Sequence, residues 1–395
     1  MGTLQRPTAG IGSIMATAFE WRIDFYSGGA WQTLPSVQGI NIFRGRRLQI
    51  DDYSIDTMTV ESEFPSSWTV APKLGDRIVA YIYKPGVVTG MDHFAAFWGN
   101  IRDVKINYGY VTNQDRVTIS CEGIQADWGR AQLNSFSLAE KLTEDQVFDV
   151  GTEVGLPIAP FNGRSTASAQ TYTGNAFALI NLITRTEEAR MLAQSVTYHA
   201  TPEIYWYGRN SPPQTTYYFN DGTGTAYPYQ MKYEQIQFRS SADNYYTSVT
   251  ITPDAVASQT ATTGVTPIYS WQKNTVDYST SQALNHAEWV LNNFDSKDQT
   301  IASVTFTDVQ QVAAIYPPPN NFNIDVITLI MSPINTLGNI SFRGSVFKTI
   351  LEGISISATP EKTRCTVFMS GQDTNAYLIL DNATFGTLDN NKLGF

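Results

Sequence analysis

Charged residues are scarce in this 395-residue chain. Asp, Glu, Lys and Arg make up 16 % of it, against about 25 % in an ordinary soluble domain. Aromatic residues reach 12 %, so Ser, Thr, Asn, Gln and Tyr must cover much of the surface. Surfaces between protein subunits are likewise poor in Lys and Glu and rich in Tyr and Trp. Two classes of protein therefore fit the composition: a subunit largely covered by partners, or a secreted β-rich protein.

Cysteine and histidine are almost absent. Two cysteines, Cys121 and Cys365, are too few for a disulfide framework, and the sequence favours two buried free thiols over one long-range bridge. None of the three histidines has a second His or Cys at metal-ligand spacing. His286 is interpreted as an ordinary residue at the polar edge of a helix. No metal and no cofactor are expected.

Long hydrophobic runs and an excess of positive charge are also missing. No window approaches the ~20 apolar residues of a membrane span, and the first 21 residues lack the apolar core of a signal peptide. We therefore expect a soluble chain that is made in a cytoplasm. The formal net charge of −10 argues against a nucleic-acid binder, because phosphate contacts need clustered Lys and Arg. It is compatible with nucleic acid that passes without being held.

Sequence motifs of enzymes are absent as well. The chain has neither a nucleophile elbow nor a phosphate-binding loop. Carboxylates gather in one early stretch: Asp51, Asp52, Asp56, Glu61 and Glu63. Two of them across a groove would suit a glycosidase, but a solvated face, or pairing with nearby arginines, is the favoured interpretation. We expect no enzyme.

The sequence predicts a mainly β, β-rich α+β fold. Strands are expected where apolar residues alternate with polar ones; in the first third these are 21–26, 37–43, 76–83, 97–106 and 116–122. The last third also alternates, at 246–252, 301–307, 354–358, 363–370 and 376–381, with one helix at 281–294. The predicted domains are a first β-domain over 1–135, an inserted α+β domain over 136–235 and a second β-domain over 236–395.

The middle third contains helix signals. Thr143-Glu-Asp-Gln146 reads as a capping box, followed by a helix that Gly155 ends. A second helix is predicted over 175–183. The aromatic stretch 198–233 is divided by polar turns, so it is expected to form short hairpins. The Ala/Thr/Ser/Gln-rich residues 256–265 are predicted to be a flexible loop.

Several segments together resemble the tail-hub "minor tail proteins" of siphophages that infect Actinobacteria. The C-terminal Ile-Leu-Asp strand, Phe-Gly-Thr-Leu-Asp and closing Leu-Gly-Phe at 379–395 carry the resemblance most specifically. Further matches, in the family's order, are Arg44-Gly45-Arg46, the paired strands at 97–103 and 117–123, the helix at 143–157 and Thr186-Glu187. Ala189 stands where the family commonly has Gly, so that turn is expected to be helical. No fibre or lectin extension is expected.

The resemblance implies an architecture and a set of partners. Such proteins are similar to the baseplate hub of contractile tails, with two tail-tube-type antiparallel β-barrel domains per chain and a mixed helical and hairpin region inserted. Three chains then form a homotrimer with a pseudo-sixfold ring at the virion tail tip, assembled in the host cytoplasm. The ring joins the distal tail protein or tail tube to the tip and contacts other minor tail or fibre proteins. Its lumen holds the tape-measure protein and later passes genomic DNA without specific binding.

Three functions stay open at this stage: the trimeric hub, a hexameric distal tail protein, and a glycan-binding or glycan-cleaving tail-tip protein. The hub fits the composition and motif order best. The candidate interface residues are Arg44, Arg46, Arg47, Phe385, Leu393 and Phe395. The arginines would pair with carboxylates of a neighbouring subunit or, as slightly favoured, within the chain. The three apolar residues would anchor the chain's own barrel or a subunit seam.

Overall fold

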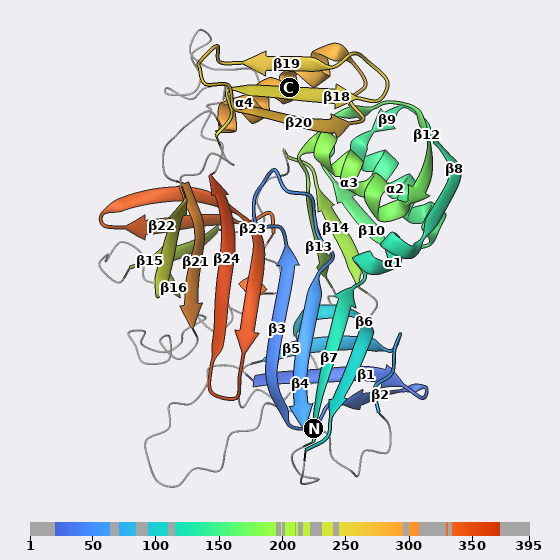
Figure 1. The fold of residues 1–395 in the computed structure, drawn as a ribbon, viewed down its shortest axis with the longest axis vertical. Helices are drawn as coiled ribbons and strands as arrows, with labels where there is room; N and C mark the ends of the chain where they lie inside the picture. The colour runs from blue at the N-terminus through green and yellow to red at the C-terminus, as the bar shows by residue number, and fades with distance from the viewer. Residues whose placement is uncertain are drawn as a thin grey trace.

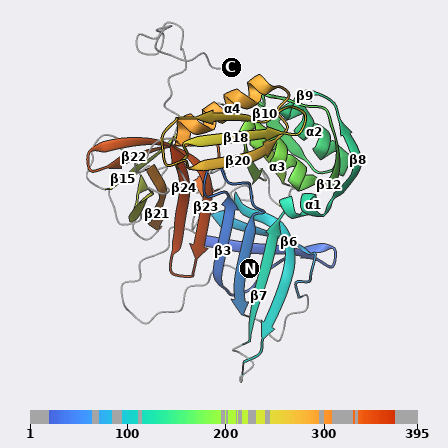
Figure 2. The same cartoon turned by 45° about the horizontal axis from the view of Figure 1, so that its top comes forward.

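A computed structural model shows three structural units, which are a large sheet, a helical insert and a small sheet with one helix (Figures 1 and 2). The structure describes residues 20–63, 71–83, 94–109, 115–194, 199, 202–209, 211, 216–221, 231–239, 245–294, 300–307, 329–330 and 334–371. None of the helices in these ranges is long and apolar enough to cross a lipid bilayer.

The large sheet has 14 strands drawn from both ends and the middle of the chain. Its N-terminal strands are β1 (Glu20–Ser27), β2 (Ala30–Thr33), β3 (Val37–Gly45), β4 (Thr57–Glu63), β5 (Arg77–Tyr83), β6 (Phe94–Asn107) and β7 (Arg116–Gly123). Its other strands are β15 (Thr216–Asn220), β16 (Met231–Lys232), β17 (Gln235–Arg239), β21 (Thr300–Thr307), β22 (Leu337–Phe342), β23 (Ser345–Ala358) and β24 (Thr363–Gly371). Nine of the ten strands predicted in the outer thirds are present: eight in this sheet, and 246–252 in the small sheet described below. The tenth, 376–381, lies outside the described residues.

The two outer β-regions are joined into this one sheet by β3 and β23. The register pairs Arg44 with Ile354 and Ile40 with Ala358. A bulge between Leu351 and Gly353 marks where β23 exchanges its partner β22 for β3. Within the described residues the pairings form an open, branched path that never returns to its start. The β-rich prediction is thus confirmed, whereas the predicted pair of closed barrels is not.

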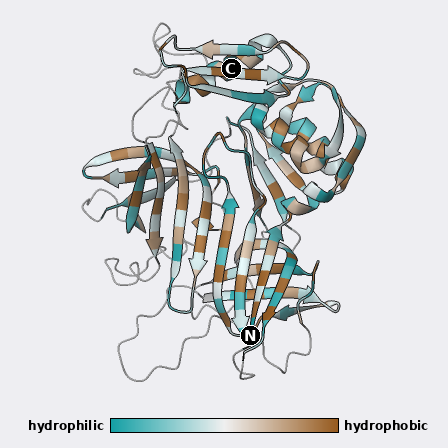
Figure 3. Cartoon of the chain, in the orientation of Figure 1, coloured by the Kyte–Doolittle hydropathy of each residue, from teal (hydrophilic) through white to brown (hydrophobic). Residues whose placement is uncertain are grey.

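One apolar core lies under this joined sheet. It combines side chains from the N-terminal strands, such as Ile42 and Ile119, with others from the C-terminal strands, such as Ile356 and Val367. Alternating strand positions supply it, so bands of opposite hydropathy follow each other along the long strands (Figure 3). Cys121 and Cys365 are both buried free thiols in this core, as predicted.

The helical insert packs beside the sheet (Figure 1). It consists of α1 (Gln125–Arg130), β8 (Gln132–Leu138), β9 (Lys141–Leu142), α2 (Thr143–Val154), β10 (Ile158–Phe161), β11 (Thr166–Ala167), β12 (Gln170–Asn175), α3 (Ala176–Glu187), β13 (Arg190–Gln194) and β14 (Glu203–Tyr207). Helix α2 ends as predicted, because Gly155 adopts the left-handed conformation at φ 66°. Asn175 caps α3 by accepting a hydrogen bond from the backbone N–H of Ala178 at 2.8 Å.

The predicted capping box is wrong. Leu142 is the N-cap of α2 and makes no side-chain cap. The Thr143 hydroxyl instead donates to Glu187 at 3.0 Å. The Gln146 amide donates to three backbone carbonyls, those of Ala139, Ala167 and Ser168. Burial decides the outcome, because both side chains face the interior of the insert and satisfy groups there that water cannot reach.

The predicted hairpins within 198–233 are also not what the described strands form. β14 pairs in parallel with β10 and antiparallel with the preceding β13. β15 pairs in parallel with β16 and with the distant β22. Local turn residues indicated where these strands end, but their partners come from elsewhere in the chain.

The small sheet consists of β18 (Ser248–Pro253), β19 (Gln259–Thr262) and β20 (Ser270–Thr275), with α4 (Thr280–Phe294) packed on it. Strand β19 lies within the stretch predicted to be a flexible loop, and it pairs antiparallel with β18. The three-domain division at 135/136 and 235/236 stays a prediction. β15 and β16, inside the predicted insert, lie in the large sheet, and β18–β20 with α4 form their own core.

Candidate functional site

The outer face of the large sheet carries polar side chains across the junction of the two β-regions. The register aligns one row of residues over β17, β21, β24, β23, β3, β4 and β7: Gln235, Thr305, Thr366, Ser355, Phe43, Thr57 and Glu122. A second row consists of Thr307, Arg364, Ser357, Asn41, Thr59, Ser120 and Asp103. We call these two rows the polar face. Hydroxyl and amide groups dominate it, which accounts for part of the scarcity of charge in the sequence.

A groove of about 370 Å³ lies on the C-terminal part of the polar face. Its lining includes Gln237, Ser303 and Arg364 from β17, β21 and β24. Hydrogen bonds between neighbouring strands hold the lining side chains in place. For example, the hydroxyls of Thr305 on β21 and Thr366 on β24 are 2.9 Å apart. The lining holds hydroxyls, amides, one cation and the ring of Phe368, with no carboxylate. The surface of the groove is therefore mostly uncharged.

Arg44 and Arg46, two of the predicted interface residues, lie inside the chain. Their exposed fractions are 2 % and 3 %. Arg44 donates to the carbonyl oxygens of Ile330 at 2.8 Å and Ala193 at 2.6 Å, and its Nε lies 3.7 Å from Asp56. Burial lowers the pKa of Arg44, and Asp56 opposes this only in part. Arg44 therefore connects the sheet to the strand β13 of the insert.

Arg46 belongs to a buried group of charges around Glu352. The Arg46 Nε donates to Glu352 Oε2 at 2.8 Å, and Arg190 Nε lies 3.7 Å from Oε1 of the same carboxylate. The Ser370 hydroxyl also donates to Glu352, at 2.6 Å. Burial by itself raises the pKa of Glu352, but Arg46 and Arg190 outweigh it and the pKa is lowered. Glu352 thus stays ionised and links β23, the segment after β3 and the insert.

A second buried group joins the insert to the small sheet. His286 of α4 lies between Glu188, at 3.0 Å from Nε2, and Asp277, at 3.4 Å from Nδ1. Burial would raise the pKa of Glu188, but Lys273, His286 and Arg46 together hold it at about 2. His286 is therefore not the polar-edge residue that the sequence indicated; it is 3 % exposed and cross-links two units.

His286 makes the stability of the molecule depend on pH. Burial lowers its pKa, yet the hydrogen bonds and charges of Asp277 and Glu188 outweigh burial and raise it. Stabilisation from a raised histidine pKa is fully present below the ordinary value near 6.5 and is lost as pH rises through the folded-state pKa. We expect the melting temperature of the wild type to fall by roughly 2 °C more between pH 6 and pH 9 than that of His286→Gln. Parallel pH profiles measured by differential scanning calorimetry would contradict this role.

The Thr186-Glu187 motif lies beside these charges, in the last turn of α3, so these two residues are helical as expected, but the helix ends before Ala189. The Thr186 hydroxyl accepts from the backbone N–H of Val276 at 2.9 Å. Glu187 accepts from Ser165 N–H at 2.8 Å. Glu188 then ends the helix in the left-handed conformation at φ 49°. The motif therefore serves as a joint between the insert and the small sheet.

The remaining predicted interface residues are Arg47 and three residues near the C-terminus. Arg47 is exposed, 5.7 Å from the ring centres of Phe43 and Phe368 at the border of the polar face. Phe385, Leu393 and Phe395 lie outside the described residues. The interface role of all six residues stays a prediction.

Three of the five early carboxylates are engaged by groups of the chain itself. Asp52 binds Arg185, with Oδ1 2.6 Å from Nε, and the buried Asp56 accepts from the N–H of Gly45 at 3.1 Å. Glu63 pairs with Arg116 at 3.3 Å. In the part of the chain that the structure describes, no group of three or more His, Cys, Asp and Glu is arranged to hold a metal ion.

Sequence reasoning missed the buried residues that connect the units, chiefly Glu188, Arg190, Asp277 and Glu352. One signal was available: charged residues such as Arg190 and Glu352 occupy strands that otherwise bury their side chains, and a charge in a buried strand needs a partner. Their pairing was not accessible, because the partners lie up to 306 positions apart.

The fold is shared with solved phage tail proteins. The 43 kDa tail protein of prophage MuSo2 from Shewanella oneidensis has a TM-score of 0.56 at 12 % identity, over 89 % of this chain and 96 % of that one. The tail protein from Neisseria meningitidis MC58 has a TM-score of 0.59 at 9 % identity, over 89 % and 97 %. No model of a protein family and no curated protein matches the sequence. Over almost its whole length the chain therefore has the fold of phage tail proteins, which it resembles in structure and not in sequence.

Proposed function

We propose that this chain is a structural, non-enzymatic protein of a phage tail tip: a trimeric hub that joins the tail tube or distal tail protein to the tip. Three copies contribute six tube-type β-regions to a pseudo-sixfold ring. The ring surrounds the tape-measure protein and later the genomic DNA. The siphophage and Actinobacteria assignment rests on the sequence resemblance, and the shared fold of phage tail proteins supports the broader role.

The continuous polar face carries this proposal. It spans strands of both β-regions in one register, so one chain supplies two similar stretches of wall. A wall rich in hydroxyl and amide groups, in a chain of net charge −10, does not retain phosphate groups. The opposite side of the same sheet is the apolar core. The polar face therefore suits the lumen side of a ring.

Arg47, exposed at the border of the polar face, is the predicted arginine best placed to reach a neighbouring subunit. Phe385, Leu393 and Phe395 are proposed as apolar anchors of the chain's C-terminal segment, in its own β-region or at a subunit seam. Arg44 and Arg46, which are buried, would act on assembly only through the shape of the joint between sheet and insert.

Copy number in an intact tail tests the proposal. Cryo-electron microscopy should show three copies in a ring between the tail tube and the tip, with the polar face toward the axis. Six identical copies would instead identify the chain as the hexameric distal tail protein. A peripheral position, combined with glycan binding or hydrolysis by the purified chain, would instead identify it as a glycan-binding or glycan-cleaving tail-tip protein.

Adding cations to the polar face should slow DNA release. Thr59→Lys combined with Ser357→Lys places two new positive charges in the second row, and Ser357 is exposed while Thr59 is half-buried. Each trimer would then hold DNA phosphates where the wild type holds none. We expect assembled tails with DNA ejection slower on the order of tenfold, measured by dye uptake into released DNA.

The matched control is the double variant Thr152→Lys with Ser281→Lys. These residues are exposed on α2 and α4, away from the polar face, and the net charge changes by the same amount. Ejection equally slow in the control pair, or unchanged in the polar-face pair, would contradict a lumen position of this face.

A further inference from the structure

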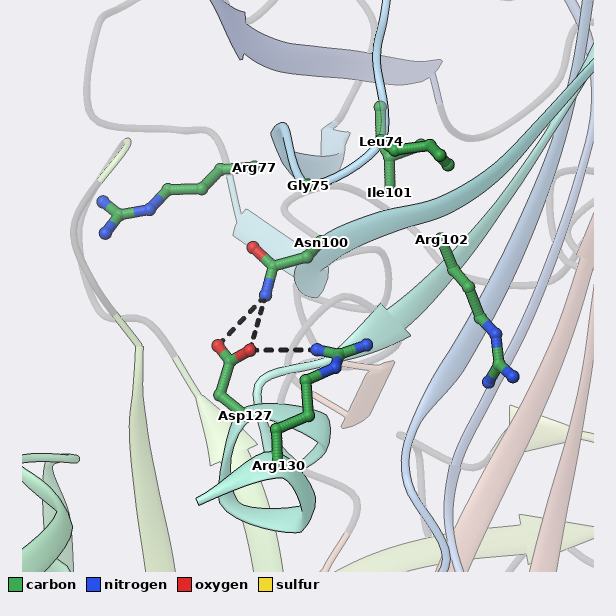
Figure 4. Close-up of a pocket in the computed structure, with 8 residues that line it drawn as sticks. All are labelled: Leu74, Gly75, Arg77, Asn100, Ile101, Arg102, Asp127 and Arg130. Atoms are coloured by element: carbon green, nitrogen blue, oxygen red, sulfur yellow. Dashed lines mark hydrogen bonds and ion pairs between the residues drawn. The ribbon is translucent and has the colours of Figure 1, made fainter. Parts of the chain in front are cut away.

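A second cavity, of about 520 Å³, lies where the sheet meets α1. Three arginines line it: Arg77 from β5, Arg102 from β6 and Arg130 from α1. Figure 4 shows Arg77 and Arg102 on opposite sides, with the side chains of Asn100, Asp127 and Arg130 between them. We call this the arginine pocket. In a chain with ten more acidic than basic residues, such a gathering of guanidinium groups needs an explanation.

The carboxylates in and beside the pocket do not neutralise its arginines. Glu122 contacts both Arg102 and Arg130, and Asp127 contacts Arg130 at 3.1 Å. The contacts that the structure gives to Arg77 include no ion pair; its guanidinium lies 5.8 Å from the centre of the Trp98 ring. Among the described residues, three guanidinium groups therefore share two carboxylates, Asp127 in the lining and Glu122 beside it, and Arg77 is the one left without an ion pair.

The floor of the pocket is fixed in place. The Asn100 amide donates to both oxygens of Asp127, at 3.1 and 3.0 Å. Asp127 in turn holds Arg130 by Nη1. Because these contacts orient the Arg130 guanidinium before any ligand arrives, a ligand loses less free energy in ordering the site.

We propose that the arginine pocket binds the carboxylates of an acidic polypeptide segment supplied by a partner protein. Guanidinium groups present paired N–H donors whose geometry matches a carboxylate. Leu74, at the rim, is 68 % exposed and offers an apolar contact to the methylene groups of a Glu or Asp side chain. The inference needs only the pocket, and it holds whether or not the polar face lines a channel.

A nucleic acid fits this pocket less well. Binding a phosphate backbone requires several cations in succession, and the pocket has one cation in excess. A nucleic-acid strand leaving the pocket along the sheet would next meet Asp103 and Glu61, at register positions on the same face, where Lys105 offsets only the charge of Asp103. Repulsion by these carboxylates disfavours a polyanion of DNA length, whereas a short acidic segment of a protein ends within the pocket.

The test uses the full chain and fluorescein-labelled hexaglutamate as the probe, with binding measured by fluorescence anisotropy at low ionic strength. We expect Arg77→Gln to weaken binding roughly threefold, and Arg77→Gln with Arg102→Gln roughly tenfold, since each exposed pair contributes a modest amount. Arg77→Gln removes no ion pair within the part of the chain that the structure describes, so the fold should stay intact, and a thermal melt checks this.

The matched control is Lys105→Gln with Arg116→Gln, because both side chains are exposed on β6 and β7 and the loss of charge is the same. This pair should bind hexaglutamate as the wild type does. An equal loss in the control pair overturns the proposal, because it would make binding a property of overall charge. No binding to the wild type, or tighter binding of a twelve-nucleotide oligothymidylate, overturns it as well.

Discussion

Glu352→Gln should destabilise the protein strongly. The substitution keeps the shape of the side chain but removes the charge that Arg46 and Arg190 face. Glu352 is 0 % exposed and both arginines are nearly as buried, so two guanidinium groups lose their counter-ion in a site that water does not reach. Breaking such a buried pair costs about 3–5 kcal/mol. For a chain of this length we expect the melting temperature to fall by roughly 5 °C.

Glu63→Gln is the control for this variant. Glu63 also pairs with an arginine, Arg116 at 3.3 Å, but its side chain is 43 % exposed. Surface pairs of this kind contribute under about 1 kcal/mol. Differential scanning calorimetry of both variants at pH 7 makes the comparison, and a Glu352→Gln melting temperature within a degree of the control would refute the importance of the buried group.

Gly353→Ala should loosen the junction between the two β-regions. Gly353 lies at the bulge of β23, and an added Cβ would be 2.5 Å from the Arg46 carbonyl oxygen and 2.6 Å from that of Arg44. These are backbone atoms, so the strands themselves must separate. Overpacking of this kind costs about 3 kcal/mol. The pairing of β3 with β23 should weaken before the rest of the sheet does.

Two measurements test the effect of Gly353→Ala. Thermal unfolding gives the loss of stability, and reaction of Cys121 and Cys365 with a thiol reagent reports access to the shared core, since the two thiols are buried on the two sides of the junction. Gly371→Ala serves as the control, because an added Cβ there meets no atom within 4 Å. Thiol reactivity as slow in Gly353→Ala as in the control would show that the junction tolerates the extra atom.

Local sequence signals located the elements well. Alternation predicted β1, β3, β5, β6 and β7 within a few residues, because a strand with one buried face must alternate. Gly155 marked a helix end through its tolerance of the left-handed backbone conformation, and Asn175 marked a helix start through its capping side chain. These signals involve neighbours in the chain, and neighbours are visible in a sequence.

Signals failed where a distant partner competes for the same group. The Thr143 hydroxyl could cap its own helix, but Glu187 accepts its hydrogen bond. β15 is flanked by turn residues typical of a hairpin, yet it pairs with β22, more than a hundred positions later. His286 has the spacing of an exposed helix residue until Glu188 and Asp277 surround it. Burial and pairing arise only on folding.

The scarcity of charge shows most clearly which properties come from the sequence alone and which come from the tertiary structure. The sequence by itself determined that this is a β-rich chain whose surface relies on hydroxyl, amide and aromatic groups, with two free thiols and no recognisable catalytic motif. Only the tertiary structure decided where those groups gather, because the register of β3 on β23 aligns Ser355 and Ser357 with Phe43 and Asn41. It also turned some of the few charges inward, where Arg44, Arg46 and Glu352 connect the units. Strand alternation is a property of consecutive residues, whereas a continuous face and a buried ion pair depend on which distant strands meet.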